Sequence, residues 1–190
     1  SFLLNVAPSA FDSIECTNRM VDVYNDAMNT HTTSSLPVWR SLLYVPTNVE
    51  RFVDKAHTRG ADVVQLDLED SVPPSEKAKA RTMIEAAVPR VRRGGADVVV
   101  RINRPLSMAV RDIEACVIEG IDGLAITKVS GPAHLQLFDE LVTQLEIERG
   151  LPVGKVKFLA MVETPQAFLI IDSILRASPR IISASIGGED

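Results

Sequence analysis

Ten residues, VKFLAMVETP at positions 156–165, hold the pattern that decides the fold of this chain. The nearly continuous apolar run 156–162 predicts a strand covered on both faces, as in parallel sheets. Glu163 follows at its carboxyl end. Thr164 and Pro165 then begin a helix, because threonine caps a helix well and proline fits its first position. The stretch is therefore a strand-to-helix junction with a carboxylate at the end of the strand.

The same alternation runs through the chain from Arg40 onward. We expect six short strands, rich in β-branched residues, at 41–45, 62–68, 97–102, 123–129, 156–162 and 181–186. Helical periodicity predicts helices between them: after Asn48, after 73–75, over 112–119, after 131–132 and after Thr164. Repeated strand and helix units with right-handed crossovers leave two architectures, a doubly wound open sheet and a (β/α)8 barrel.

The position of the polar residues favours the barrel. Neither glycine pair, 94–95 or 187–188, lies in a GxGxxG or GxxxxGK[ST] context, so the fingerprint of an open nucleotide-binding sheet is missing. Five of the expected strands end in polar groups: Glu69 and Asp70, Arg101 and Asn103, Lys128, Glu163, and Glu189 and Asp190. In a parallel barrel these ends meet at one mouth, where barrel enzymes place their chemistry. The sequence predicts an α/β fold, a (β/α)8 TIM barrel with about six βα units in this chain.

Composition and charge exclude several functional classes. The chain has 20 Lys and Arg against 25 Asp and Glu, a net charge of -5, which argues against a nucleic-acid partner. Cys16 and Cys116 form no CxxC pair, which predicts a reducing compartment; we expect the cytoplasm, with an organelle matrix as the alternative. No apolar stretch approaches the roughly 18 residues of a membrane span, so no membrane partner is expected. Three histidines without HExxH or HxH spacing leave carboxylates as the expected ligands of any metal.

Glu163 and Asp190 end two successive strands and form the candidate metal site. Adjacent strands lie about 4.8 Å apart, so carboxylates at neighbouring strand ends can share a cation. Hard oxygen ligands indicate Mg²⁺, with Mn²⁺ as the usual substitute. The glycine pair at 187–188 permits the close approach of a ligand or another backbone. The alternative is that both residues are solvated loop acids.

Arg101 is the candidate for binding a substrate carboxylate or a carbonyl oxygen that gains charge. Its alternative role, an ion pair with Glu69 or Asp70, is compatible with that function. The segment 66–70 carries three acids, more than are needed to end a strand. Some of them are expected to form ion pairs with Arg40, Arg101 or Lys128, or to join a water network at the metal. Cys116 and the three histidines are expected to have structural or surface roles.

The first residues have a different pattern from the rest. We expect residues 1–37 to be a partly helical N-terminal extension and residues 38–190 to be an incomplete barrel domain. A typical barrel of this fold has about 250 residues, so we expect the chain to continue beyond Asp190.

Six motifs in order resemble one known family. They are RSLLYVP at 40–46, LDLEDSV at 66–72 with Lys77 and Arg81 after it, VRIN at 100–103, KV at 128–129, VET at 162–164 and GGED at 187–190. This set is similar to the citrate lyase β-subunit-like branch of the HpcH/HpaI aldolase superfamily. The resemblance runs from about residue 38 to the last residue, and six motifs in order make it specific.

The resemblance implies a barrel of the phosphoenolpyruvate-binding type, homotrimeric or homohexameric, that cleaves or forms a carbon–carbon bond in a 3-hydroxyacyl-CoA thioester. Citryl-, malyl- and citramalyl-CoA are substrates of this kind, and the products are an acyl-CoA and a 2-oxoacid. Glu163 and Asp190 match the family's Mg²⁺ ligands, and Arg101 matches its substrate-binding arginine. Glu69 and Asp70 match the acidic pair that supports this arginine and the metal-bound water.

The resemblance also places Arg40 and Lys77 where contacts with CoA phosphates, or supporting ion pairs, can form. Two alternatives remain open. A class II pyruvate-type aldolase would act on free 4-hydroxy-2-oxoacids, but this branch carries a histidine soon after the first strand, where residues 46–51 have none. A non-catalytic barrel subunit would keep the site residues without turnover.

Overall fold

A computed structural model describes residues 37–187, which form a parallel sheet with helices between successive strands. The six strands are β1 (Leu42–Pro46), β2 (Val63–Asp67), β3 (Asp97–Ile102), β4 (Gly123–Ile126), β5 (Lys157–Val162) and β6 (Ile181–Ile186). All six expected strands are therefore confirmed. The expected N-terminal extension, Cys16, His31, Glu189 and the proposed metal ligand Asp190 lie outside the described residues.

The strand order distinguishes between the two architectures. Every strand pairs in parallel with its neighbour in the chain, in the order β1-β2-β3-β4-β5-β6. A doubly wound sheet reverses its strand order at a switch point, whereas consecutive strands of a (β/α)8 barrel follow the sequence. The fold is therefore of the barrel type. Among the described strands, β1 and β6 each have one partner.

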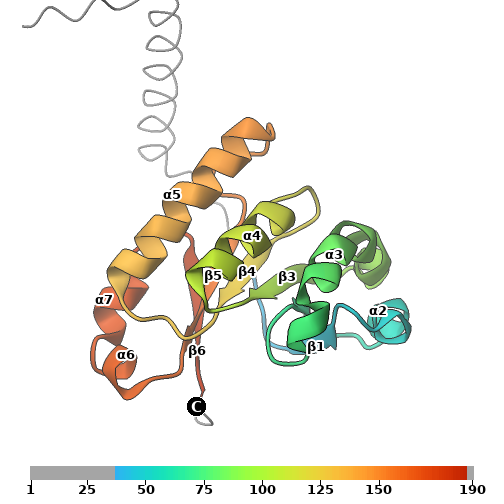
Figure 1. The fold of residues 1–190 in the computed structure, drawn as a ribbon, viewed down its shortest axis with the longest axis horizontal. Helices are drawn as coiled ribbons and strands as arrows, with labels where there is room; N and C mark the ends of the chain where they lie inside the picture. The colour runs from blue at the N-terminus through green and yellow to red at the C-terminus, as the bar shows by residue number, and fades with distance from the viewer. Residues whose placement is uncertain (1–36, 188–190) are drawn as a thin grey trace, which may run out of the picture. The chain divides into compact units, whose positions relative to one another are not determined.

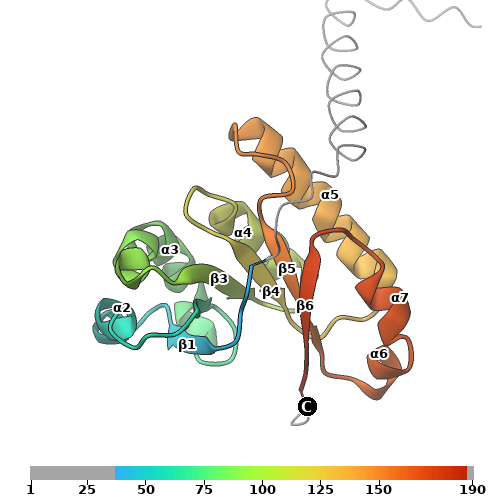
Figure 2. The ribbon, with the colours of Figure 1, turned by 180° about the vertical axis from the view of Figure 1, so that it is seen from behind.

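The helices lie along one side of the sheet, as Figures 1 and 2 show from opposite directions. They are α2 (Glu50–Ala56), α3 (Lys77–Val91), α4 (Leu106–Cys116), α5 (Pro132–Glu148), α6 (Pro165–Leu169) and α7 (Ile171–Leu175), with short 3-10 turns at Pro74–Glu76 and Arg92–Gly94. None of these helices is long and apolar enough to cross a membrane.

Two apolar clusters lie on the two faces of the sheet. The larger one packs alternate strand residues, such as Val64, Val98 and Leu124, against the helices. The smaller one lies on the helix-free face and contains Val63, Val99, Ala125, Leu159 and Met161. Successive residues of a strand point to opposite faces of the sheet, so every second residue lies on the same face. In each strand, the residue two positions after a member of this cluster therefore also lies on the helix-free face, nearer the carboxyl end of the strand.

Most strand ends differ from the sequence expectation by one residue or not at all, and three elements differ by more. Strand β4 ends at Ile126 and not at 129, because Lys128 adopts a left-handed φ of 48° that an extended strand cannot contain. Helix α4 covers residues 106–116 and not 112–119. The helix after Thr164 is divided into α6 and α7, because Ile170 has a non-helical φ of -116° between them.

Candidate active site

The helix-free face carries its charged residues at the carboxyl ends of the strands. Asp67 ends β2 and is in register with Arg101 near the end of β3, and Glu163 directly follows β5. The sheet therefore brings Arg101, Glu69, Asp70 and Glu163 to the same edge, as the polar strand ends predicted.

Arg101 is held mainly by Asp67. Its Nε donates to Asp67 Oδ1 at 2.8 Å and its Nη2 donates to Asp67 Oδ2 at 2.6 Å, a bidentate pair. The guanidinium is also 5.2 Å from the centre of the Tyr44 ring. Burial lowers the pKa of Arg101, but the hydrogen bonds and charge of Asp67 raise it above its usual value. The guanidinium is thus a permanent cation in a fixed orientation.

Asp67 is the partner that sequence reasoning did not single out among the three acids. Its carboxylate also accepts hydrogen bonds from the backbone N–H groups of Glu69, at 2.8 Å, and Ser71, at 3.1 Å, and from the Ser71 hydroxyl. Burial raises the pKa of Asp67, yet hydrogen bonds from Arg101 and Ser71 outweigh it, and the pKa lies below its usual value. The register of β2 against β3, which the sequence does not give, places Asp67 opposite Arg101.

Glu69 and Asp70 complete the acidic surroundings of Arg101. Nη1 of Arg101 lies 3.1 Å from Asp70 Oδ2 and 3.2 Å from Glu69 Oε2. Asp70 is largely exposed, whereas Glu69 is buried and its Oε2 has no hydrogen-bond partner. Burial raises the pKa of Glu69, against the effect of a hydrogen bond from Lys128. The Oε2 atom of Glu69 therefore has an ion pair with Arg101 but no hydrogen bond among the described residues.

Lys128 lies between the two groups of acids. Its Nζ donates to Glu69 Oε1 at 3.0 Å, and its backbone N–H donates to Glu163 Oε2 at 2.6 Å. On the other side, Glu163 packs against Gly187, where an added Cβ would lie 2.9 Å from Glu163 Cγ. A larger residue at 187 would therefore displace the side chain of Glu163.

Buried and partly buried polar contacts hold the loop that carries Glu69. Asn103 Nδ2 donates to the Leu68 carbonyl at 3.0 Å, and Lys77 Nζ donates to the Leu68 and Glu69 carbonyls at 3.0 and 2.7 Å. Asp112, fully buried in α4, in turn accepts from Asn103 Nδ2 at 2.7 Å. Lys77 thus contacts backbone carbonyls in this structure.

Arg40 is not brought together with the other candidates. It pairs with Asp62 at 2.7 Å, and these residues precede β1 and β2 respectively, so the pair lies at the amino ends of the strands. The side chain of Arg40 is 77% exposed. The acids at the end of β2 pair with Arg101 and Lys128 instead.

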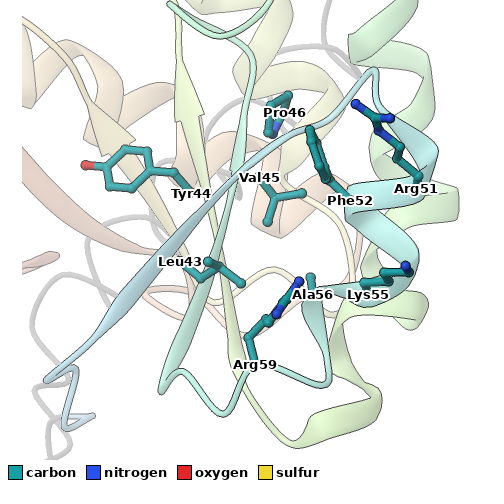
Figure 3. Close-up of a pocket in the computed structure, with 9 residues that line it drawn as sticks. All are labelled: Leu43, Tyr44, Val45, Pro46, Arg51, Phe52, Lys55, Ala56 and Arg59. Carbon is teal, nitrogen blue, oxygen red and sulfur yellow. The ribbon is translucent and has the colours of Figure 1, made fainter.

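A cavity of about 790 Å³ opens between β1 and α2 (Figure 3). Its lining combines apolar residues, such as Leu43, Val45 and Phe52, with Arg51, Lys55 and Arg59 of α2 and the turn after it. Tyr44 points away from α2, toward the face that carries Arg101 (Figure 3). This cavity is therefore separate from the Asp67–Arg101 pair.

The acids at the strand ends suit a hard cation. Within residues 37–187, the carboxylates of Asp67, Glu69, Asp70 and Glu163 contact Arg101 and Lys128, and the charges of these six groups sum formally to -2. Carboxylate oxygens are the ligands that Mg²⁺ prefers. Within residues 37–187 no three His, Cys, Asp or Glu side chains converge on one metal position. Glu163 fits as one ligand, and its expected partner Asp190 lies outside this range.

A family model described as HpcH/HpaI aldolase/citrate lyase matches residues 40–190. The citrate lyase subunit beta of Leuconostoc mesenteroides subsp. cremoris is 35% identical over 152 residues, which cover 80% of this chain and 50% of that protein. The L-malyl-CoA/beta-methylmalyl-CoA lyase of Cereibacter sphaeroides is 33% identical over 155 residues, which cover 80% of this chain and 48% of that protein. The chain spans about half the length of these relatives.

A solved structure is similar to the described fold. The crystal structure of protein CitE from Mycobacterium tuberculosis, in complex with magnesium and acetoacetate, superposes with a TM-score of 0.59 at 26% identity. The match covers 82% of this chain and 57% of that chain.

Proposed function

Since the chain belongs to the HpcH/HpaI aldolase/citrate lyase family, we propose that its protein is a magnesium-dependent carbon–carbon lyase acting on a 3-hydroxyacyl-CoA thioester. The expected products are an acyl-CoA and a 2-oxoacid, and the reverse reaction is the condensation. Relatives named citrate lyase subunit beta and L-malyl-CoA/beta-methylmalyl-CoA lyase support this class of reaction.

The observation that carries the proposal is the fixed orientation of Arg101 at the carboxyl edge of the sheet. Asp67 holds two of its nitrogens, Nε and Nη2, and Nη1 lies on the side of Glu69 and Asp70. The remaining N–H groups of this permanently charged guanidinium, on Nη1 and Nη2, can donate to a carboxylate or to an oxygen that gains negative charge. Because its orientation is set before substrate arrives, it needs little reorganisation during the reaction.

The proposed reaction breaks the carbon–carbon bond between the hydroxyl-bearing carbon and the α-carbon of the acyl group, and leaves the thioester bond intact. The hydroxyl proton leaves, and its electron pair forms the carbonyl of the 2-oxoacid. The electrons of the broken bond pass to the acyl group as an enolate, which takes up a proton to give the acyl-CoA. Arg101 would bind the oxygen on which charge changes in this step.

Glu163 and Asp190 would hold the Mg²⁺, with Mn²⁺ as a substitute. When bound, the cation supplies Lewis-acid polarisation of the hydroxyacid oxygens. The chain's own residues keep Glu163 in place for that task, because Lys128 N–H binds one carboxylate oxygen and Gly187 packs against the side chain.

The test is an assay of the full-length protein with malyl-, citramalyl- and citryl-CoA, with and without Mg²⁺. We expect cleavage of at least one thioester that chelation abolishes and Mg²⁺ restores. Cleavage of free 4-hydroxy-2-oxoacids in place of thioesters would assign the protein to the aldolase branch. Mg²⁺ binding without cleavage of any thioester would indicate a non-catalytic subunit.

Glu163→Gln tests the metal site directly, since it removes the charge and keeps the shape. It should weaken Mg²⁺ binding at least about tenfold and abolish turnover without changing the circular dichroism spectrum. The matched control is Glu148→Gln, in an exposed acid at the end of α5. Equal Mg²⁺ affinity in the two variants would refute the assignment of Glu163.

A further inference from the structure

Lys128 has an unusual backbone conformation for its residue type. Its φ of 48° makes it the one non-glycine residue with positive φ among residues 37–187. A side chain in this left-handed region costs roughly 1–2 kcal/mol, and such strain is retained mainly at functional sites. We therefore ask which contacts of Lys128 with the surrounding residues depend on this backbone conformation.

The neighbours of Lys128 are anchored to the two adjacent strands. On one side, Thr127 Oγ1 donates to the Ile102 carbonyl at 3.1 Å. On the other side, Val129 N–H donates to the Met161 carbonyl at 3.2 Å. The left-handed turn at Lys128 thus lies between two fixed points, and it ends β4 at the edge of the sheet that carries the acids.

Three parts of Lys128 contact three different loops. The backbone N–H binds Glu163 after β5, the Nζ binds Glu69 after β2, and the carbonyl accepts from Arg104 Nε after β3 at 3.0 Å. One residue thereby ties the candidate metal ligand to the acid that pairs with Arg101.

We infer that Lys128 is a positioning residue, whose backbone N–H orients Glu163 for the divalent cation and whose ammonium keeps Glu69 engaged beside Arg101. This inference rests on the proposed function for its catalytic consequence, but its effect on cation binding does not depend on the substrate. The left-handed backbone allows the N–H and the side chain of one residue to serve both acids. The positive charge of the ammonium also offsets part of the negative charge of the acids that surround the cation site.

The ammonium can be removed while the N–H to Glu163 is kept. Lys128→Met does so with the left-handed strain in place, and Lys128→Gly does so with the strain relieved. In both variants Glu69 loses a cationic partner, so we expect turnover of the full-length protein to fall by about tenfold or more. Mg²⁺ added alone should bind about fivefold more tightly, because a positive charge near the cation is gone.

The controls separate this role from a structural one. Lys128→Arg keeps the charge and should stay within about threefold of the wild-type Mg²⁺ affinity and turnover. Lys79→Met removes an exposed lysine of α3 and should change neither. The circular dichroism spectra of all variants should match that of the wild type. A Lys128→Met variant that keeps its turnover, or that binds Mg²⁺ more weakly than Lys79→Met, would overturn the inference.

Failure of the inference differs from failure of the proposed function. If the wild type cleaves no thioester but Mg²⁺ binds more tightly to Lys128→Met and Lys128→Gly, the lyase function is wrong and the positioning of the acids holds. If the wild type cleaves a thioester and both variants behave like Lys79→Met, the function holds and the role of Lys128 is wrong. A wild type that does not bind Mg²⁺ overturns both.

Discussion

The Asp67–Arg101 pair gives a prediction whose size follows from the structure. Asp67 is 1% exposed, and its carboxylate accepts from two guanidinium nitrogens, two backbone N–H groups and the Ser71 hydroxyl. Asp67→Asn keeps the shape, removes the charge and turns an amide N–H₂ toward these donors. Removing one partner of a buried ion pair costs about 3–5 kcal/mol. Arg101 keeps Glu69 and Asp70, so we expect the lower end, about 3 kcal/mol.

Urea unfolding of the full-length protein, followed by circular dichroism, measures this loss. With an m-value of about 3 kcal/mol/M, a loss of about 3 kcal/mol lowers the midpoint by roughly 1 M. The matched control is Asp62→Asn, which weakens the exposed pair with Arg40 and should hardly move the midpoint, because water screens it. Equal midpoints for Asp67→Asn and Asp62→Asn would refute the reasoning.

The same pair fixes the pH dependence of the effect. The pKa of Asp67 is lower in the folded protein than its ordinary value of 3.8, so its carboxylate stabilises the fold above about pH 4. This stabilisation is lost as the pH falls through the lowered folded pKa. The difference between the wild type and Asp67→Asn should therefore shrink below about pH 4, and a difference that grows on acidification would contradict the assignment.

Three other groups give shorter predictions. Arg180→Met leaves Asp139 and Glu146 buried without their cation and should destabilise the protein by about 3–5 kcal/mol, measured by urea unfolding. Burial raises the pKa of the Cys116 thiol well above its usual range, so in a Cys16→Ser background a thiol reagent should modify Cys116 only after unfolding. Burial lowers the pKa of His134 to about 4; its NMR titration should show this, and stability should fall as the pH drops from about 6.5 toward 4.

The fold was predictable because its signals are local. Each strand is an apolar run that must be covered on both faces, and the junction at 162–165 carries its own helix signal, confirmed by the Ala167 N–H that binds Thr164 Oγ1 at 3.2 Å. Strand ends were less predictable. The run 123–129 is largely apolar, yet β4 stops at Ile126, because contacts with other loops impose a turn at Lys128.

The site was predictable as a set of residues but not as a set of contacts. The rule that parallel strands end at one edge places Arg101 and Glu163 together without any structure. It does not say which of three adjacent acids faces the arginine, because that depends on the register between β2 and β3. Register puts Asp67 opposite Arg101, and burial then selects it over the exposed Asp70. The resemblance-based placement of Arg40 near phosphates has no comparable support, since Arg40 lies at the amino ends of the strands.

The contrast between Arg101 and Lys128 explains why the sequence identified the second residue as a strand-end lysine but not its contacts. Arg101 points toward the acids because it lies on a regular strand, where alternation alone sets the direction of the side chain. Lys128 reaches Glu69 and Glu163 only because the chain leaves the strand and adopts a left-handed φ, which no apolar pattern encodes. A non-glycine residue in that conformation is held there by its surroundings, here by anchors on both sides and by two acids. The direction of a side chain in such a turn depends on contacts with residues far away in the sequence. In this fold, the contacts of the strand-end loops are therefore the part of the site that is hardest to predict from the sequence.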